Sequence, residues 1–337
     1  MSLSPLLSLL RAHDPRAFLQ ITGDWKSMLR MHFLHAAISS GLLEALDRPR
    51  SWEDLVHELE VERPQLLDAL LQLGVSLGEL DHNSEGYSLR GSRARALRKE
   101  KNDALAALVE ANVTYYNSVF QGFSQRMRGG ELAEGVGAIG PLVARVSMIA
   151  EPYLQHFLGT AVKGKGRLRV LDVGCGSGLH LRRALEMNPA LTCVGLELDP
   201  EVVRQARDNI LRWGQAERIR VEEGDVRSLP PGAGGPFDLV LLFSVIYYFG
   251  GEERAAVLRG IRGNLAPGGV LALATSCQGE GCDLFSANLN LATSSMEGLT
   301  PLPEGAEMES QLRAAGFTDI RRARLIPKTT YFGFLAS

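Results

Sequence analysis

Apolar residues recur at helical spacing through the first hundred residues, and turn-forming residues interrupt them. The first apolar stripe runs from Met28 to Ile38 and stops near Gly41. A second helix is expected after Ser51, because a serine hydroxyl can accept a hydrogen bond from an unpaired backbone N–H of the first turn. A third is expected to begin around Pro64, because proline is tolerated in a first helical turn.

Residues 80–89 have two short apolar ends around a polar turn that contains Gly86, a pattern that predicts a β-hairpin. Three helices followed by a hairpin predict a winged-helix-like domain over residues 1–100. Residues 101–165 have a helical pattern that only a glycine-rich stretch at 129–140 interrupts. We expect this segment to be a helical linker between two domains.

After residue 165 the pattern changes to short apolar runs that alternate with helical segments. These strand-length runs occupy residues 170–173, 192–196, 237–242 and 270–274. Strands that alternate with helices are typical of a parallel sheet. The predicted fold class is therefore α/β, with a Rossmann-like domain over residues 166–337 preceded by an all-helical, winged-helix-like domain.

The first strand of this second domain runs into a glycine-rich turn, Asp172-Val173-Gly174-Cys175-Gly176-Ser177-Gly178. Glycines let the backbone turn sharply and approach a ligand closely. The next strand ends at Glu197, about 20 residues further on, where a carboxylate can accept hydrogen bonds from two ribose hydroxyls. Dinucleotide enzymes space their glycines as GxGxxG, so the tighter DxGxGxG spacing here disfavours a pyrophosphate-binding turn.

Five motifs stand in order along the second domain: VLDVGCGSG, VGLELD, EGDV, FDLVLL and LAPGG. Together they resemble the class I S-adenosylmethionine (SAM)-dependent methyltransferases, and the resemblance covers about residues 166–337. The N-terminal half is similar to the dimerisation domain of the small-molecule O-methyltransferase branch. The cofactor that this resemblance implies is SAM.

The resemblance also implies a role for each cofactor-binding position. Asp172 and the turn glycines would hold the methionine end of SAM, and Glu197 would bind the ribose. The adenine would meet Asp225 and Val226. The residues implied as cofactor-binding are Asp172, Gly174, Gly176, Gly178, Glu197, Asp225, Val226, Phe243 and Ser244, the last two beside the sulfonium. No Cys/His cluster has the spacing of a metal site.

The O-methyltransferase branch typically has a catalytic histidine after its fourth strand, and this chain has Tyr247 there. All seven histidines lie at or before His180, and His156 and His180 are expected at the surface or at a helix start rather than as bases. Tyr247 could act as a weak base, orient a substrate, present its ring to a cation, or simply line the core. Tyr116 is a second catalytic candidate, because in such enzymes its helix covers the active site; amphipathic packing is the alternative.

Polar residues near the C-terminus interrupt an otherwise apolar stretch that resembles the substrate pocket of the branch. They are Asp283, Asn288, Asn290 and Ser294. Such groups suggest a substrate that forms hydrogen bonds.

Charge and composition limit the classes of binding partner that we expect. The formal net charge is −3 and the isoelectric point is near 6.2, which calls for neither nucleic acid nor an anionic membrane. The third helix has no Lys or Arg after Arg63, which disfavours DNA recognition, and the basic run 90–101 is expected to be a solvated face. A leucine-rich first domain without a cofactor motif favours a homodimer.

The expected location is the cytoplasm. The N-terminal apolar run is short and lacks a basic flank, and no apolar stretch approaches the roughly 20 residues of a bilayer span. The cysteines at 175, 193, 277 and 282 are expected to be thiols.

The leading functional hypothesis is methyl transfer from SAM to a small molecule, in secondary metabolism. A second is a cyclase similar to azetidine-2-carboxylate synthase, in which the amine of SAM attacks its own aminopropyl carbon and expels methylthioadenosine. A third is a winged-helix regulator that uses SAM only as a ligand.

Overall fold

The computed structural model describes residues 14–133, 140–228, 234–281 and 283–337. The described chain divides into two compact units. The first unit contains the chain up to Phe120 together with Pro141–Met148, and the second contains the remainder. Cys282 lies outside the described residues, and Cys175, Cys193 and Cys277 are buried free thiols.

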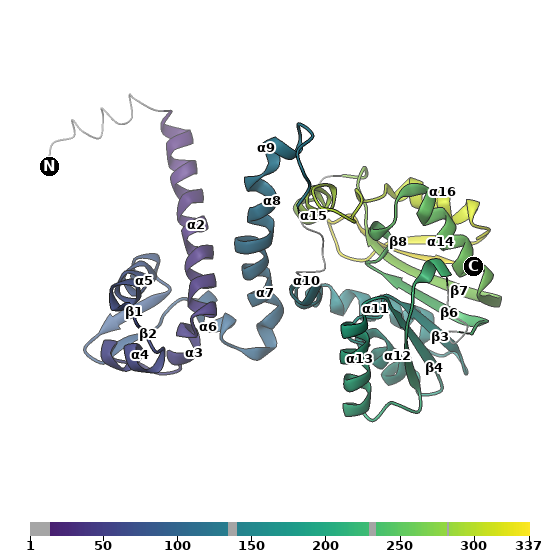
Figure 1. Ribbon diagram of the computed structural model, residues 1–337, viewed down its shortest axis with the longest axis horizontal. Helices are drawn as coiled ribbons and strands as arrows, with labels where there is room; N and C mark the ends of the chain where they lie inside the picture. Colours follow the sequence, from purple (N-terminus) through teal and green to yellow (C-terminus); the bar gives the residue numbers. More distant parts are fainter. Residues whose placement is uncertain (1–13, 134–139, 229–233, 282) are drawn as a thin grey trace. The chain divides into compact units, whose positions relative to one another are not determined.

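The N-terminal unit is helical apart from the hairpin that its sequence predicts (Figure 1). Its first elements are α2 (Pro15–Ser39), α3 (Leu42–Ala45), α4 (Trp52–Glu58), α5 (Pro64–Leu77), β1 (Leu80–Asn83), β2 (Gly86–Leu89), α6 (Ser92–Leu97) and the short η1 (Glu100–Asn102). The three predicted helices and the hairpin are confirmed.

Local capping explains where these helices begin. Ser51 and Asp54 form a reciprocal capping box at α4, and Pro64 occupies the first turn of α5. Helix α2 begins well before Met28, because Asp14 accepts hydrogen bonds from the N–H groups of Arg16 and Ala17. That first half of α2 has no apolar stripe facing the core, so periodicity alone did not reveal it.

The predicted linker is helical, as expected, on both sides of the glycine-rich stretch, of which residues 134–139 lie outside the described chain. Its elements are α7 (Asp103–Ala111), the π-helical turn η2 (Asn112–Tyr116), α8 (Asn117–Gln121), α9 (Phe123–Arg126), α10 (Gly140–Ser147) and α11 (Glu151–Val162). Within the N-terminal unit, Arg145 of α10 pairs with Asp103 and Glu110 of α7.

The second unit is built on a seven-stranded sheet in the order β5-β4-β3-β6-β7-β9-β8. The strands are β3 (Arg169–Val173), β4 (Thr192–Glu197), β5 (Ile219–Glu223), β6 (Phe237–Phe243), β7 (Leu265–Ser276), β8 (Ile320–Arg324) and β9 (Tyr331–Ala336). Strands β3 to β7 pair in parallel, and β9 pairs antiparallel with both β7 and β8. The strand order therefore reverses between β3 and β6.

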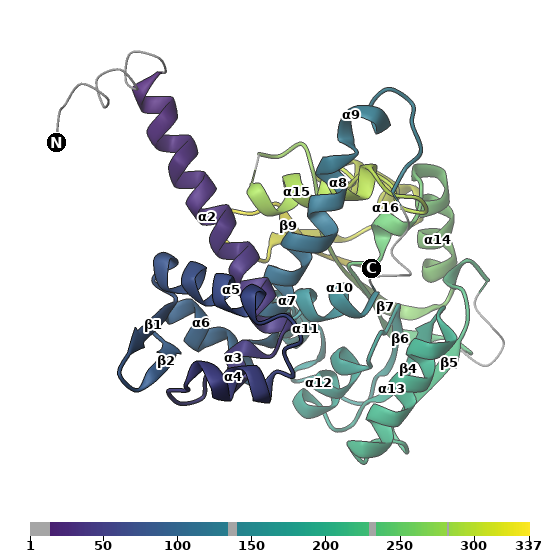
Figure 2. The same ribbon diagram turned by 60° about the vertical axis from the view of Figure 1, so that its left-hand side comes forward.

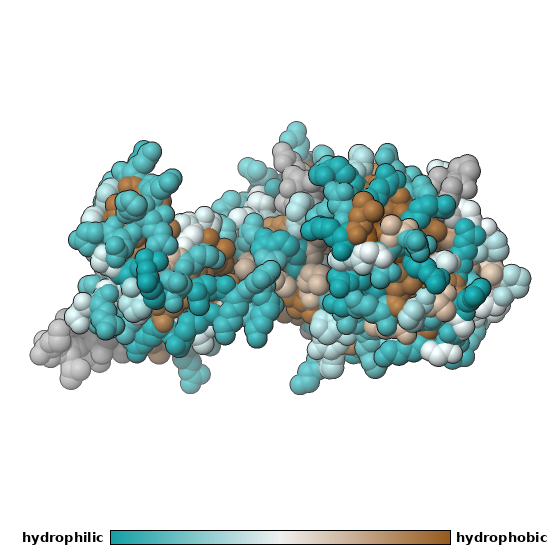
Figure 3. Space-filling model, turned by 90° about the horizontal axis from the view of Figure 1, so that it is seen from below, coloured by the Kyte–Doolittle hydropathy of each residue, from teal (hydrophilic) through white to brown (hydrophobic). Residues whose placement is uncertain are grey.

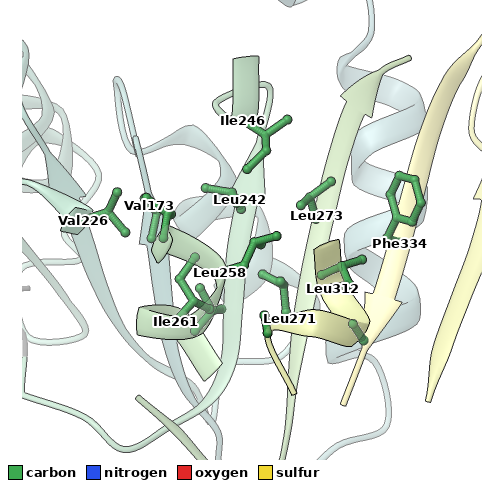
Figure 4. Packing of buried hydrophobic residues seen from close by; sticks show 14 of the residues in the cluster. Val173, Val226, Leu242, Ile246, Leu258, Ile261, Leu271, Leu273, Leu312 and Phe334 are labelled. Carbon is green, nitrogen blue, oxygen red and sulfur yellow. The ribbon is translucent and has the colours of Figure 1, made fainter. Parts of the chain in front are cut away.

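Helices cover both faces of this sheet (Figures 1 and 2). One face packs against α11, α12 (Leu179–Met187) and α13 (Pro200–Arg212), and the other against α14 (Gly251–Gly263) and α16 (Gly305–Ala314). Figure 4 shows the second core, where Leu258 and Ile261 of α14 and Leu312 of α16 meet the side chains of β6 and β7. Because strands β3 to β7 are parallel, their carboxyl ends lie along one edge of the sheet.

The sequence pattern missed part of this sheet. Strand β7 begins at Leu265, ahead of the predicted run at 270–274, because Leu265 pairs with Phe237 before a register irregularity. Strands β8 and β9 were not predicted. The β8 sequence, Ile-Arg-Arg-Ala-Arg, has no apolar alternation because β8 is an exposed edge strand.

The surface is mostly hydrophilic on the face drawn in Figure 3, with apolar residues scattered among polar ones. Within the described chain, no helix is both long enough and apolar enough to cross a bilayer.

Candidate active site

The carboxyl ends of β3, β4, β5 and β6 bring most of the predicted site residues to one edge of the sheet. Asp172 lies at the end of β3, Glu197 at the end of β4, Asp225 just after β5 and Phe243 at the end of β6. In open α/β sheets, ligands bind at the carboxyl edge where the strand order reverses. That point lies here between β3 and β6.

The turn after β3 is held tightly against its neighbours. Gly174, Gly176 and Gly178 have φ values of 68°, 52° and 80°, in the left-handed region that favours glycine. The N–H of Gly174 donates to the carbonyl of Leu196 at 2.8 Å. A Cβ on Gly174 would lie 2.7 Å from Cγ2 of Val245, so the first glycine is required by packing as well as by conformation.

Glu197 connects this turn to the end of β4. Its Oε2 accepts a hydrogen bond from the N–H of Gly176 at 3.0 Å, and its Oε1 accepts from the N–H of Leu198 at 2.9 Å. The carboxylate is half-buried, so its remaining lone pairs can still accept hydrogen bonds from a ligand.

Asp172 is a buried carboxylate with an unsatisfied oxygen. The residue is 1% exposed, and its Oδ2 has no hydrogen-bond partner among the described residues. Burial raises the pKa of Asp172 from 3.8 to about 7, with further contributions from the charges of Glu197 and Glu151 and an opposing one from His180. A buried oxygen left unsatisfied is costly, so this atom is suited to receive a ligand donor.

Asp225 is held by its neighbour Arg227. Its Oδ1 accepts from the N–H of Arg227 at 2.9 Å and its Oδ2 from Nε at 2.7 Å, while the same guanidinium reaches Glu253 at 3.0 Å. The hydrogen bond from the Arg227 side chain keeps the pKa of Asp225 below its usual value. Val226 is buried in the apolar core beside it.

The end of β6 is polar and strained. Ser244 has a φ of 58°, which is uncommon for a residue with a Cβ. Its Oγ lies 3.2 Å from the hydroxyl of Tyr331 on β9, a buried phenol whose pKa is raised by that burial to about 12. Tyr331 was missed because its strand was missed. The ring of Phe243 packs edge-on to His180, with centroids 5.1 Å apart.

Tyr247 lies in the turn η5 (Ile246–Tyr248) that follows β6, and it is nearly buried at 9% exposure. Thr300 holds this turn in place, because its N–H and its Oγ1 both donate to the carbonyl of Tyr247, at 3.0 and 2.9 Å. Buried Arg254 stabilises the same turn by donating to Phe249 O and Thr300 Oγ1, each at 2.8 Å.

Tyr248, which the sequence analysis passed over, is next to Tyr247 with ring centroids 5.2 Å apart. Burial raises the pKa of Tyr248, with a smaller contribution from the charge of Glu197. Tyr116 belongs to the N-terminal unit, in the π-helical turn η2, where its ring lies 4.9 Å from that of Tyr115. Its part in the site stays a prediction.

Two of the polar residues near the C-terminus form hydrogen bonds within the second unit. Asp283 caps α15 (Leu284–Ser294) through Ser286 and also accepts from the N–H and hydroxyl of Thr330. Asn290 donates to Gln278 and accepts from the N–H of Leu302. The described residues contain no group of three or more His, Cys, Asp or Glu side chains suited to a metal ion.

The contacts of His180 could not be predicted from its position at a helix start. It is the second residue of α12, and its Nε2 lies 3.2 Å from Oε2 of buried Glu151. Its Nδ1 lies 4.0 Å from Oδ2 of Asp172. No sequence motif indicates this contact, because Glu151 comes from α11, outside the predicted domain boundary at residue 166.

Residues 171–271 match the family described as a methyltransferase domain. Among curated proteins, the chain is 34% identical to a ribosomal protein L11 methyltransferase of Xylella fastidiosa over 131 residues, 38% of each chain. It is 33% identical to the erythromycin 3''-O-methyltransferase of Saccharopolyspora erythraea over 159 residues, 45% of this chain and 51% of that one. The chain thus spans about half or less of the length of these two relatives.

Solved structures match over almost the whole chain. The mitomycin 7-O-methyltransferase MmcR matches with a TM-score of 0.77 at 19% identity, over 98% of this chain and 99% of that one. Human N-acetylserotonin methyltransferase, solved with SAM, matches with a TM-score of 0.73 at 17% identity, over 96% and 98%. The chain therefore has the α/β fold of class I methyltransferases, with a helical N-terminal region as in the small-molecule O-methyltransferases.

The pKa of Asp172 leads to a stability prediction. Between about pH 4 and 7 the folded chain keeps a proton that the unfolded chain has lost, so this residue makes the fold less stable as pH rises. Asp172→Asn removes that cost. We expect the ligand-free variant to be more stable than the parent at pH 8, by up to about 4 kcal/mol, and nearly unchanged near pH 4. Thermal unfolding at both pH values measures this.

The matched control is Glu252→Gln, which neutralises an exposed carboxylate of the same unit and should leave stability nearly unchanged at both pH values. An Asp172→Asn variant that melts below the parent at pH 8 would contradict the cost assigned to this buried charge.

Proposed function

We propose that this protein transfers a methyl group from SAM to a small molecule. The observation on which the proposal depends is the unsatisfied buried oxygen of Asp172 next to the left-handed glycine turn and Glu197. These groups occur together at the reversal of strand order, within the segment that matches a methyltransferase domain.

The residues fit the chemistry of SAM. Asp172 is suited to its ammonium group, because that group would supply the positive donor that Oδ2 lacks. The carboxylate of Glu197 is suited to two ribose hydroxyls, and Asp225 with Val226 offers an acceptor and an apolar surface to the adenine. Gly174, Gly176 and Gly178 let the backbone approach closely, and Phe243 and Ser244 end the strand nearest the turn.

Bound SAM would supply an electrophilic methyl group on its sulfonium, so the protein has chiefly to align an acceptor and exclude water. Alignment alone can lower the barrier by about 7–11 kcal/mol. A general base adds perhaps ~10²–10⁴-fold where the acceptor must lose a proton. The chain has no histidine after position 180, so we propose an acceptor that needs little help in deprotonation, such as an amine, an acidic enol or an activated carbon.

Tyr247 occupies the position at which the O-methyltransferase branch typically has its catalytic histidine. A phenol with an ordinary pKa near 10 is a poor base at neutral pH. Its ring face is better suited to attract a sulfonium-like charge within about 6 Å. We therefore assign Tyr247 a role through its ring, and propose Tyr116 as a second residue of the substrate side.

The substrate class is proposed from the matched structures. Their titles include a mitomycin 7-O-methyltransferase and a methyltransferase of calicheamicin biosynthesis, and the curated relatives include an erythromycin O-methyltransferase. We propose a small molecule of that general kind as acceptor. The cyclase and regulator hypotheses receive no support from these comparisons, and we do not retain them.

Incubation of the purified protein with SAM and a panel of small phenols, amines and enols tests the proposal. We expect S-adenosylhomocysteine and a product heavier by one methylene in mass spectrometry. Methylthioadenosine formed from SAM alone would contradict methyl transfer and favour cyclisation. Failure to bind SAM or S-adenosylhomocysteine in calorimetry would reject the cofactor itself.

Glu197 is the residue proposed to bind the ribose. Glu197→Ala should weaken SAM binding by about 1–3 kcal/mol, because it removes a charged acceptor and the hydrogen bond to Gly176. Calorimetry measures this, with Glu223→Ala as the matched control. Glu223 ends the neighbouring strand β5 with an exposed side chain and should leave the affinity unchanged. Equal SAM affinity in Glu197→Ala and the parent would refute the assignment of Glu197.

Substitutions of Tyr247 separate its three roles. If the ring acts, Tyr247→Phe should retain activity and Tyr247→Ala should lose it, because only alanine removes the π face. If the hydroxyl acts, Tyr247→Phe should lose turnover while SAM binding survives. Turnover, SAM affinity and melting temperature are measured for both variants. Full activity with a lowered melting temperature in Tyr247→Ala would exclude a direct part in the chemistry.

We further propose that the winged-helix-like domain forms a homodimer and does not bind DNA. Helix α2 exposes four large apolar side chains, which are 51–68% exposed: Leu19, Ile21, Trp25 and Met28. The last three recur at helical spacing and share one face of the helix. Exposed apolar patches of this kind are typical of association surfaces.

Light scattering should find a dimer at micromolar concentration, and Trp25→Glu should shift it toward monomer because a charge would have to be buried. Leu66→Glu, which alters a leucine of α5 that is 61% exposed, is the matched control and should remain dimeric. A monomeric parent protein, or binding to duplex DNA at physiological salt, would contradict this proposal.

A further inference from the structure

His180 lies between two buried carboxylates of the second unit. Glu151 on α11 is 5% exposed and Asp172 on β3 is 1% exposed. The two ring nitrogens of His180 face them separately, Nε2 at 3.2 Å from Glu151 and Nδ1 at 4.0 Å from Asp172. The edge of the ring is fixed by Phe243, at an interplanar angle of 77°. Three elements and an aromatic contact thus determine the orientation of one imidazole.

The charges around this imidazole are mostly negative. Glu151 faces it from α11, Asp172 from β3, and Glu197 from β4 adds its charge to that of Asp172. Arg183, on the next turn of α12, acts on Glu151. Among the described residues, the other polar groups near these carboxylates include Gln155, which donates to Glu151, the phenol of Tyr331 on β9, and the thiols of Cys175 and Cys193, whose pKa values are raised by burial.

Such a cluster is costly to fold, because each buried carboxylate loses its hydration. One imidazolium can balance only part of three carboxylates, so a second positive group would complete the balance. The unsatisfied Oδ2 of Asp172 is the atom that such a group would contact. An ammonium group satisfies both requirements, since it brings a positive charge and hydrogen-bond donors.

We propose that His180, held by Glu151, is a positioning residue that orients and balances Asp172 so that its free oxygen receives the ammonium group of the cofactor's methionine moiety. This inference rests on the proposed function. It assigns His180 no contact with the reacting methyl group, since both ring nitrogens face carboxylates. It also gives a half-buried histidine and a buried glutamate from a preceding helix a role that the five sequence motifs do not include.

The protonation state of His180 decides whether both contacts are favourable. An imidazolium has an N–H on each nitrogen, whereas the neutral ring has a single N–H and would turn a lone pair toward one carboxylate. Burial opposes the charged ring, but the hydrogen bond to Glu151 and the charge of Asp172 outweigh burial and raise the pKa of His180. The charged ring in turn favours the ionised form of Asp172, which is the form that binds an ammonium group.

The protonation states of Asp172 and His180 determine how ligand affinity changes with pH. Asp172 binds the ammonium group when ionised, so affinity falls as pH drops through the pKa of Asp172. Removing His180 removes the charge that lowers this pKa, so the fall in affinity should begin at a higher pH. The loss should be greatest on the acid side of neutrality and should narrow as pH rises.

Two ligands separate positioning from a general structural effect. S-adenosylhomocysteine has the ammonium and carboxylate groups, and methylthioadenosine keeps the adenosine and sulfur but has neither. Calorimetry at about pH 6.5 and about pH 8.5 on the full chain gives the affinity of each. For His180→Gln we expect S-adenosylhomocysteine to bind about tenfold more weakly near pH 6.5 and within about threefold of the parent near pH 8.5. Methylthioadenosine should bind unchanged at both.

His156→Gln is the matched control, because His156 lies on the same helix as Glu151 but is exposed. His180→Asn, measured in the same way, is the second variant, and it should behave as His180→Gln does. An equal loss for both ligands, or an unchanged ratio of their affinities at both pH values, overturns the proposal. A parent protein that binds neither ligand instead refutes the proposed function, so the two failures are distinguishable.

Discussion

The arrangement of the candidate site in the second unit depends on the close approach of the turn after β3 to the end of β4. Gly174 and Cys175 both donate their N–H groups to the carbonyl of Leu196, and Gly176 donates to Glu197. Gly195 is part of the same constraint, because a Cβ there would lie 2.6 Å from Sγ of Cys175. Backbone hydrogen bonds and the close contact of Cys175 with Gly195 therefore hold the turn, and the N-terminus of α12 is fixed where a ligand would need it.

This packing brings three carboxylates to one small volume. Asp172, Glu197 and Glu151 are each positioned by the backbone or by a neighbour, and His180 lies between two of them as a potential cation. Their mutual repulsion and lost hydration make the ligand-free site less stable than an apolar one would be. Sites arranged for a charged ligand commonly reduce stability in this way.

Most of the second unit could be predicted from the sequence because its strands are buried and apolar. Val170–Val173 and Phe237–Leu242 are short apolar runs, and the glycines between them have a spacing that only a tight turn requires. What periodicity could not reveal was the edge pair β8 and β9, or contacts between segments far apart in the chain. The pairing of His180 with Glu151 and of Ser244 with Tyr331 depends on tertiary packing, which a pattern read along one segment does not contain.

The same edge strand has a consequence for behaviour in solution. Unpaired strand edges are places where sheets of different molecules join and aggregate. Strand β8 lines its edge with Arg321, Arg322 and Arg324, and the last two stack on Phe332 while Arg322 also pairs with Glu280 and Glu309. Another strand could add here only by displacing these guanidinium groups or burying their charge. The arginines that remove apolar alternation from β8, and so prevented its prediction, thus also protect this edge of the sheet from aggregation.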